Sequence, residues 1–130
     1  MIVGTGVDIV AVARIQAWID EKKDGALARA FTEQELAYCR QKGRPAESLA
    51  ARFAAKEAVM KVLGTGWAEG IGFQQVEVVR DERGKPGVEL TGEAAERAGR
   101  LGIQTLHLSL SHTADHAVAF VVAEGPETGS

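Results

Sequence analysis

The clearest pattern of hydrophobic and polar positions is a strict alternation near the C-terminus. Over residues 105–111, three leucines alternate with threonine, histidine and serine. A period of two predicts a β-strand with one buried face. The apolar run over 117–123 predicts a second strand. The short polar segment 112–116 between the two runs predicts that they form a hairpin.

The rest of the chain divides into short strands and helical segments. A strand is expected over 1–7, and a further hairpin over 73–80 and 87–90 around the charged turn 81–86. The pattern Thr32-Glu33-Gln34-Glu35 is a capping box, which predicts the start of a helix. Helices are expected over 11–20, 26–31, 32–41, 46–63 and 91–101.

This order of elements indicates an α+β fold. We expect a single domain in which helices pack on one face of a mostly antiparallel sheet. A chain of 130 residues is long enough to bury a normal hydrophobic core. The domain is expected to span 1–124, and the polar segment 125–130 is expected to be a flexible tail.

The helix expected over 46–63 has an unusual distribution of charge. Its large apolar side chains fall on one side of a helical wheel, and Arg52 and Lys56 lie within the same arc. Glu57 and Lys61 lie beside that arc. A surface helix usually carries its charges opposite its apolar stripe, so we expect this helix to be largely buried. The four charges then either form an internal ion-pair network, with Glu57 and Lys61 as an i,i+4 pair, or bind a ligand.

Asp8 is a charged residue in apolar surroundings at the end of the first expected strand. Its ordinary role there would be to cap the helix that follows, and its functional role would be that of a metal ligand. The residue alone favours the cap. Gly4 and Gly6 do not form a dinucleotide-binding fingerprint, because position 9 is isoleucine. Glycine in a strand more often permits a close approach of the backbone.

The composition narrows the classes of protein that the chain can belong to. The hydrophobic fraction of 45% and charged fraction of 25% are those of a soluble globular protein. No apolar run approaches the roughly 20 residues that cross a membrane, and the N-terminus lacks a signal-peptide pattern. The single cysteine, Cys39, fits a reducing compartment and is expected to be a structural thiol. We therefore expect a cytoplasmic protein.

The charge of the chain is unevenly distributed. The net charge of −3 argues against general nucleic-acid binding. Residues 40–61 nevertheless hold six basic and two acidic side chains, an excess of four positive charges. Such a segment is either a solvated basic surface or a site for an anionic ligand or acidic partner.

Three segments together resemble a known family. They are 4–10 (GTGVDIV), 52–66 (RFAAKEAVMKVLGTG) and 108–112 (LSLSH). Each motif is weak alone, but their order and spacing are similar to those of the holo-[acyl-carrier-protein] synthase family, the short bacterial 4′-phosphopantetheinyl transferases. Phe31-Thr32-Glu33 and the turn 81–86 also match, so the resemblance covers nearly the whole chain.

The resemblance implies a reaction of fatty acid biosynthesis and lipid metabolism. In it, the phosphopantetheine arm of coenzyme A moves to a serine of apo-acyl carrier protein, and adenosine 3′,5′-bisphosphate is released. It also implies a Mg²⁺ site, with carboxylates at the positions of Asp8 and Glu57. Similar proteins are homotrimers that bind coenzyme A in clefts between neighbouring subunits. Neither nucleic acid nor a membrane is an expected partner.

The same resemblance assigns roles to individual residues. Asp8, Glu57 and Lys61 are the expected catalytic residues, and the general base is either Glu57 or a metal-bound water. Lys61 would contact a phosphate oxygen beside the metal, and the amides of the glycine turn would hold the diphosphate. The expected contacts of coenzyme A are Arg52, Lys61, Gly64, Thr65, Gly66, Ser111 and His112, with the basic segment 42–44 as a further candidate for its 3′-phosphate.

Arg14 matches a position at which the family contacts the carrier protein. Acyl carrier proteins are acidic, so basic side chains are expected on the docking surface. Ala17, Glu21 and Asp24 stand where similar proteins often carry arginines, so the rest of this surface departs from the family pattern. Two other hypotheses compete with the transferase: a non-catalytic module that binds coenzyme A or a carrier, and a purely structural role for the charged residues.

Overall fold

The computed structural model describes residues 1–64 and 71–127. Five helices and five strands lie within this part of the chain. In chain order they are β1 (Ile2–Ala11), α1 (Val12–Asp20), α2 (Asp24–Ala30), α3 (Glu33–Arg40), α4 (Pro45–Leu63), β2 (Val76–Arg80), β3 (Pro86–Leu90), α5 (Gly92–Arg100), β4 (Thr105–His112) and β5 (His116–Glu124), with a 3₁₀ turn over Phe73–Gln75.

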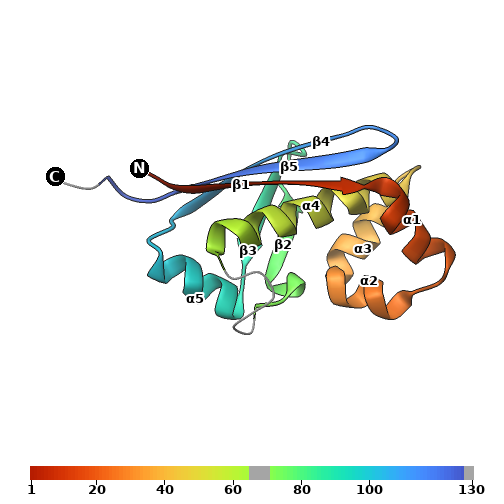
Figure 1. Cartoon of the computed structure of the whole chain (residues 1–130), viewed down its shortest axis with the longest axis horizontal. Helices are drawn as coiled ribbons and strands as arrows, with labels where there is room; N and C mark the ends of the chain where they lie inside the picture. The colour runs from red at the N-terminus through yellow and green to blue at the C-terminus, as the bar shows by residue number, and fades with distance from the viewer. Residues whose placement is uncertain (65–70, 128–130) are drawn as a thin grey trace.

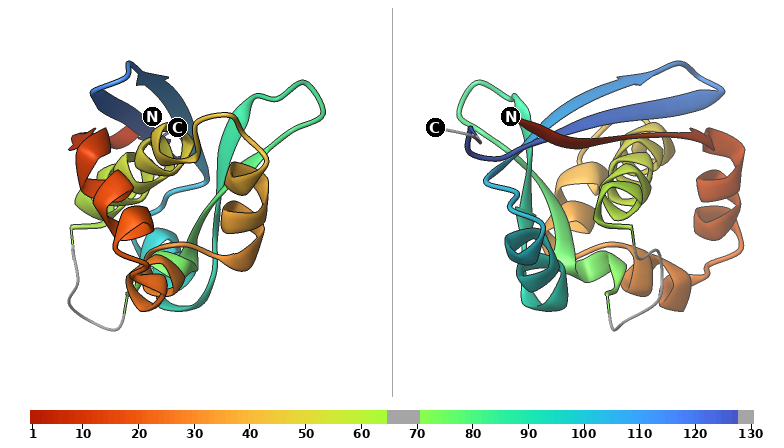
Figure 2. Two further views of the ribbon diagram at one scale, coloured as in Figure 1. Left: turned by 90° about the vertical axis from the view of Figure 1, so that its right-hand side faces the viewer. Right: turned by 60° about the vertical axis from the view of Figure 1, so that its left-hand side comes forward.

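The described strands form two antiparallel sheets, with the orders β1-β5-β4 and β2-β3. Helix α4 lies against the three-stranded sheet, and α1–α3 gather at one end of the molecule while α5 lies at the other (Figure 1). The two sheets diverge from each other, as the turned views show (Figure 2). The expected α+β domain is therefore confirmed, with the strands divided between two sheets.

Strand β1 is longer than the sequence predicted. It was expected to end at Val7, but its pairing with β5 continues to Ala11, which lies opposite His116. Asp8 consequently lies inside the strand. The expected strand over 73–80 begins only at Val76, because the three preceding residues form the 3₁₀ turn.

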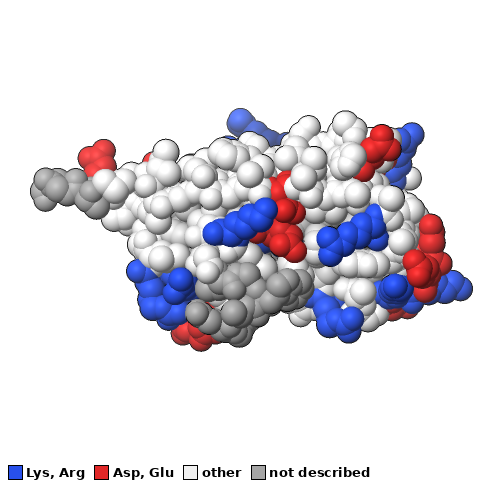
Figure 3. Space-filling view, viewed as in Figure 1, with Lys and Arg blue, Asp and Glu red and all other residues white. Residues whose placement is uncertain are grey.

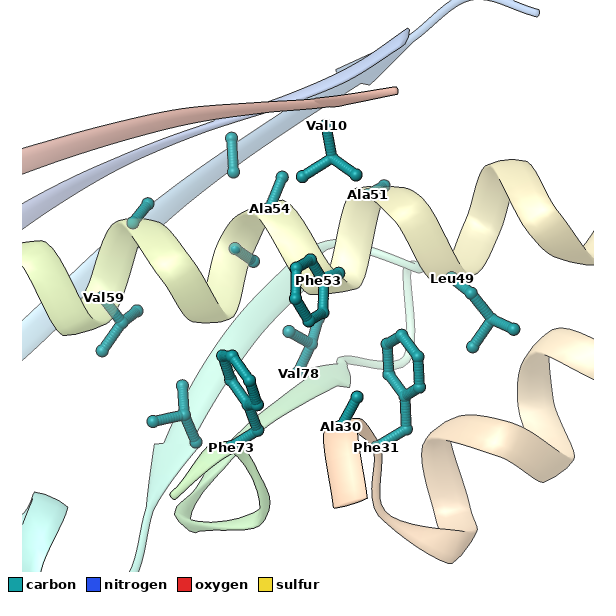
Figure 4. Packing of buried hydrophobic residues seen from close by; sticks show 14 of the residues in the cluster. Val10, Ala30, Phe31, Leu49, Ala51, Phe53, Ala54, Val59, Phe73 and Val78 are labelled. Carbon is teal, nitrogen blue, oxygen red and sulfur yellow. The ribbon is translucent and has the colours of Figure 1, made fainter. Parts of the chain in front are cut away.

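Helix α4 is buried along most of its length and separates the two sheets (Figure 4). Small residues such as Ala54 face β1 and Val10, while Phe53 projects to the other side of the helix. The ring centroid of Phe53 lies 5.0 Å from that of Phe73 and 6.2 Å from that of Phe31. Complete burial of a side chain of this size stabilises the fold by about 1.5–3 kcal/mol, so the aromatic cluster fixes the position of α4.

The close contact of β1 and α4 depends on one glycine. A Cβ atom at Gly6 would lie 2.2 Å from the carbonyl oxygen of Ala58. The expected reason for a glycine in this strand is thus confirmed at Gly6. At Gly4 the nearest atom would be 3.8 Å away, which is an ordinary contact.

The ends of the helices follow the sequence signals with one exception. The Thr32–Glu35 capping box is present, and Gly64 ends α4 in the left-handed conformation with φ of 75°. Thr91 was expected to cap α5, but its side chain makes no capping bond. The Gln75 side chain accepts from the Ala94 amide instead, at 3.0 Å. Within the described residues, no helix has the length and apolarity needed to cross a membrane.

The two ends of the described chain are joined to each other. The Met1 amino group donates to the carbonyl oxygen of Gly125 at 2.9 Å, and the Gly125 amide donates back at 2.8 Å. Residues 128–130 of the expected tail lie outside the described residues.

Candidate active site

Two carboxylates from different elements converge where β1 crosses α4. Asp8 lies opposite Ala119 of β5, which is fully buried, so both side chains point toward α4. Burial raises the pKa of Glu57, and the charge of Asp8 raises it further. The cap role of Asp8 is wrong, because α1 begins after Ala11 with no side-chain capping bond.

Lys61 places a positive charge on this acidic pair. Its Nζ donates to Oδ1 of Asp8 at 2.9 Å and to the carbonyl oxygen of Val7 at 2.8 Å. The ion pair that the structure describes is therefore Lys61–Asp8, and not the i,i+4 pair with Glu57 that was one of the two alternatives. The Lys61 side chain is half exposed, whereas that of Asp8 is 19% exposed. A ligand can therefore reach the ammonium group from solvent.

The donor set suits a magnesium ion. Among the described residues, no group of three or more histidine, cysteine, aspartate or glutamate side chains could hold a metal. Mg²⁺ commonly takes one or two carboxylates and completes its shell with phosphates and water. Asp8 and Glu57 supply two carboxylates, and the ammonium group of Lys61 shows that a cation can be held beside Asp8.

Basic side chains surround the acidic pair at the surface. On the face that Figure 3 shows, a small group of acidic side chains lies between two basic groups. Arg14 is one nearby cation, because its charge lowers the pKa of Glu57 against the raising effects of burial and Asp8. Its guanidinium also lies over the rings of Phe53, at 5.1 Å, and Trp18, at 5.7 Å.

Arg52 lies on another side of α4. It precedes Glu57 by five positions, which turns it by about 140° around the helix. It is 2% exposed, and its Nε has no hydrogen-bond partner among the described residues. The guanidinium carbon stands 4.6 Å from the ring centroid of Tyr38, which also faces Lys42 and Arg80. A cavity of about 540 Å³ opens beside this cation cluster.

His112 and Ser111 end strand β4 and point to opposite faces of the sheet. His112 lies opposite the buried Ala117, so it faces the side covered by α4, and its Nδ1 is 3.1 Å from Oε1 of Glu47. It lies two strands away from β1, which is about 10 Å. The single chain therefore does not bring Ser111 or His112 to the carboxylates.

Gly64 is the remaining expected contact that the structure describes. Its amide donates to the carbonyl oxygen of Met60 at 2.9 Å, and Arg97 of α5 donates to the neighbouring carbonyl of Leu63 at 3.0 Å. Thr65 and Gly66, which were expected to bind the diphosphate, lie outside the described residues.

A family model described as the 4′-phosphopantetheinyl transferase superfamily matches residues 4–121. The chain belongs to this superfamily. Among curated phosphopantetheinyl transferases, the holo-[acyl-carrier-protein] synthase of Geotalea daltonii is 48% identical over 95% of this chain and 99% of its own. That of Trichlorobacter lovleyi is 45% identical over 97% of this chain and 100% of its own.

Solved structures of the superfamily agree with the fold. The holo-[acyl-carrier-protein] synthase of Neisseria meningitidis superposes with a TM-score of 0.85 at 37% identity, covering 95% of this chain and 99% of that one. The Helicobacter pylori enzyme in complex with coenzyme A gives 0.80 at 31% identity, covering 93% and 100%. The family, the α+β fold and the transferase activity that the sequence indicated are thus confirmed.

In this phosphopantetheinyl transferase, Lys56 belongs to a buried network apart from the carboxylate pair. Its Nζ lies 2.6 Å from Oε1 of Glu35, and both side chains are fully buried. It also donates to the carbonyl oxygens of Phe73 and Val76. Burial lowers the pKa of Lys56, and the charge of Glu35 opposes that shift. The network interpretation therefore holds for Lys56.

Sequence reasoning missed the partners of the buried cations. The Thr32–Glu35 pattern was interpreted only as a helix start, although Glu35 also accepts from the amide of Val78. Tyr38 carried no signal of its own. Its pKa is lowered by a hydrogen bond from Lys42 and, more weakly, by the charges of Arg80, Lys42 and Arg52.

Proposed function

We propose that the chain is a Mg²⁺-dependent holo-[acyl-carrier-protein] synthase, which transfers 4′-phosphopantetheine from coenzyme A to a serine of apo-acyl carrier protein. The observation that carries the proposal is the convergence of Asp8, Glu57 and Lys61 at one accessible position, in a chain of this superfamily. Asp8 and Glu57 would hold the ion, which when bound offsets negative charge on the diphosphate.

The residues divide the work of the transfer. The serine oxygen of the carrier forms a bond to the phosphorus next to pantetheine, and the bond from that phosphorus to the oxygen of the second phosphate breaks. Adenosine 3′,5′-bisphosphate leaves with that oxygen. Glu57, whose pKa is raised by burial, is suited to accept the serine proton. Lys61 can donate to a phosphate oxygen, since positioning and charge stabilisation dominate such reactions.

The proposed contacts of coenzyme A lie on two sides of α4, which supports a site shared between subunits. Asp8, Glu57 and Lys61 form one group, whereas Arg52, beside Tyr38, and His112, beside Glu47, lie apart from it and are taken together as a second, basic group. A homotrimer with clefts between subunits would bring the two groups of different chains together. The second group, with segment 42–44, would then bind the 3′-phosphate.

The outer face of the three-stranded sheet supports the trimer. Val7, Ile9 and Phe120 are large, exposed and apolar. In the sheet, Val7 lies directly opposite Phe120. Contiguous apolar surface of this kind usually marks a protein interface. We assign it to contacts between copies of this chain.

Arg14 is proposed as a contact for the acidic carrier. It borders a small apolar pocket of about 190 Å³ together with Arg29, Trp18 and Phe53. Two cations around an apolar depression suit a partner that offers carboxylates around an apolar side chain.

Arg14→Glu should raise the KM for the carrier at least tenfold. The charge reversal Arg100→Glu, on the distant α5, is the matched control and should not change it.

The deciding experiment follows covalent transfer. Coenzyme A, Mg²⁺ and an apo-carrier are incubated with the protein, and the carrier mass is measured. A mass gain of one phosphopantetheine is expected, and Asp8→Ala or Glu57→Ala should abolish it while the fold is kept. Glu96→Ala removes an exposed acid of α5 as a control. Binding of coenzyme A with no covalent product would indicate a non-catalytic module, and full activity of both variants would exclude the metal site.

The buried free thiol of Cys39 is consistent with the cytoplasmic location that we propose for the enzyme.

A further inference from the structure

His112 is held by a carboxylate from the start of α4. Oε1 of Glu47 lies 3.1 Å from Nδ1 of His112, and Oε2 of the same carboxylate lies 3.3 Å from a guanidinium nitrogen of Arg44. The Glu47 side chain is 13% exposed, whereas the imidazole is 48% exposed and that of Arg44 is 76% exposed. One nearly buried acid thus joins two accessible basic groups.

We propose that Glu47 is a positioning residue of the coenzyme A site, which fixes the ring nitrogen and the orientation that His112 presents to a phosphate of coenzyme A. The proposal rests on the proposed function, in which His112 and the segment 42–44 contact that ligand. Glu47 itself carries a negative charge, so it acts through its two basic neighbours rather than on the phosphate.

The chemistry of the imidazole ring explains the need for such a residue. A neutral imidazole carries its proton on one nitrogen, and the bond made by the other side of the ring decides which one. A carboxylate only accepts, so Nδ1 must donate to Glu47. Nε2 is then directed away from Glu47. When the ring is protonated on both nitrogens, Nε2 can donate to a phosphate oxygen while Nδ1 keeps its bond.

The same strand contains a comparison for this arrangement. His107 also lies beside a carboxylate, but its Nε2 makes the contact, 3.0 Å from Oε1 of Glu124. The two pairs have similarly exposed imidazole rings, and the carboxylates are 13% exposed in Glu47 and 51% in Glu124. They therefore predict opposite tautomers for two histidines of one protein.

The first test measures the tautomers directly. Side-chain ¹⁵N shifts in the ligand-free protein at a pH where the rings are neutral should show a proton on Nδ1 of His112 and on Nε2 of His107. Glu47→Ala should return His112 to the Nε2–H form that imidazole prefers in water, while Glu47→Gln should keep the Nδ1–H form, since its amide oxygen still accepts. An unchanged His112 spectrum in Glu47→Ala would overturn the proposal.

The second test separates positioning from direct binding. Glu47→Ala should raise the KM for coenzyme A about tenfold with little change in kcat, the size expected for one charge-assisted hydrogen bond. The double variant Glu47→Ala/His112→Ala should have a KM for coenzyme A only slightly above that of His112→Ala. The small difference is the part of the effect that passes through Arg44. Full additivity of the two effects would contradict a role that passes through His112. Glu124→Ala, the matched control, should leave His107 in the Nε2–H form and leave the KM unchanged.

The two proposals fail in different ways. If the wild-type protein forms no holo-carrier, the proposed function is wrong, and the tautomer experiment still reports on the Glu47–His112 pair. If the wild-type protein transfers the arm but Glu47→Ala has an unchanged KM, the positioning role is wrong and the transferase stands. Circular dichroism of Glu47→Ala confirms that α4 is intact, and Glu47→Gln supplies the rescue.

Discussion

Two lysines of α4 that are five residues apart have different physical roles. Lys56 is fully buried and bonded to Glu35 and two carbonyl oxygens, so its environment is complete. Lys61 is half exposed, and its partner Asp8 is a proposed metal ligand. Identical substitutions at the two positions therefore distinguish a stabilising cation from a functional one.

Lys56→Met should destabilise the fold. The substitution leaves the charge of Glu35 buried without a cation, and breaking such a pair costs about 3–5 kcal/mol of the free energy of unfolding. Urea denaturation measures the loss. Lys61→Met is the control and should stay within about 0.5 kcal/mol of the wild type. Equal stability of the two variants would show that the buried pair is not needed, whereas Glu35→Leu combined with Lys56→Met should recover part of the loss.

Lys61→Met should instead change metal binding. The Lys61 ammonium group donates a hydrogen bond to Oδ1 of Asp8. Its removal therefore frees this oxygen to bind a metal and removes a positive charge that competes with the metal ion. We expect the affinity for Mn²⁺, as a spectroscopic substitute for Mg²⁺, to rise several-fold while phosphopantetheine transfer falls. Electron paramagnetic resonance of free Mn²⁺ measures the affinity. Lys23→Met tests for a general effect of charge, and weaker Mn²⁺ binding by Lys61→Met would contradict the competition.

The sequence predicted which α4 charges are unusual but not what they contact. Helical periodicity placed Arg52 and Lys56 among the apolar side chains, and both are buried. Their partners, Tyr38 and Glu35, come from α3, whose approach to α4 is a tertiary feature that no local pattern encodes. The metal role of Asp8 came from the family resemblance, because the local pattern favoured a cap.

At the scale of elements, the site depends on how closely β1 lies against α4. Asp8 comes from the strand and Glu57 from the helix, so their separation is set by the packing of these two elements. At Gly6 the approach is so close that a Cβ atom would collide with the carbonyl oxygen of Ala58. Small side chains at this crossing therefore serve the geometry of the carboxylates.

Gly6→Ala should push the two elements apart. Its Cβ would lie 2.2 Å from the backbone oxygen of Ala58 in α4, and such overpacking costs about 1–3 kcal/mol or more. We also expect weaker Mn²⁺ binding, because Asp8 and Glu57 separate. Gly4→Ala is the matched control, with its Cβ at 3.8 Å from Val62. Thermal unfolding and Mn²⁺ titration of both variants make the test, and similar behaviour of the two would contradict it.

Alternation predicted strand β4 well because the strand has one inward and one outward face, and the apolar run over 117–123 predicted β5. The sequence pattern failed at the end of β1, where pairing with β5 extends the strand to Ala11. It also failed at Thr91, where the side chain of Gln75 from a distant turn caps α5. Both errors arise where a partner distant in sequence decides the local structure.

At the scale of the whole molecule, the outer face of the three-stranded sheet is apolar and exposed in the single chain. Its exposed apolar residues Val7, Ile9 and Phe120 come from two neighbouring strands. Opposite them, the inner face packs on α4 and is buried. A sheet with two apolar faces is typical of an assembly in which both faces are covered.

Phe120→Lys should break the proposed trimer. A lysine at the centre of the outer face places charge where other copies would pack, and its burial would be costly. We expect a monomer by light scattering, a nearly unchanged circular dichroism spectrum, and loss of transfer. Glu96→Lys introduces the same side chain on α5 and should leave the assembly unaltered. A trimeric Phe120→Lys variant would show that the interface lies elsewhere.

Helix α4 lies between the group of Asp8, Glu57 and Lys61 and the second, basic group, and this has a consequence for measurements at low protein concentration. If the halves of each site belong to different chains, a solitary chain holds no complete site. The transfer rate per enzyme chain should then fall when the protein is diluted below the dissociation constant of the assembly. After dilution of concentrated protein, the fall should follow a lag while the assembly dissociates. The rate should recover when coenzyme A is added before dilution. Saturating coenzyme A should shift the dissociation midpoint to lower protein concentration, because every bound molecule bridges two chains.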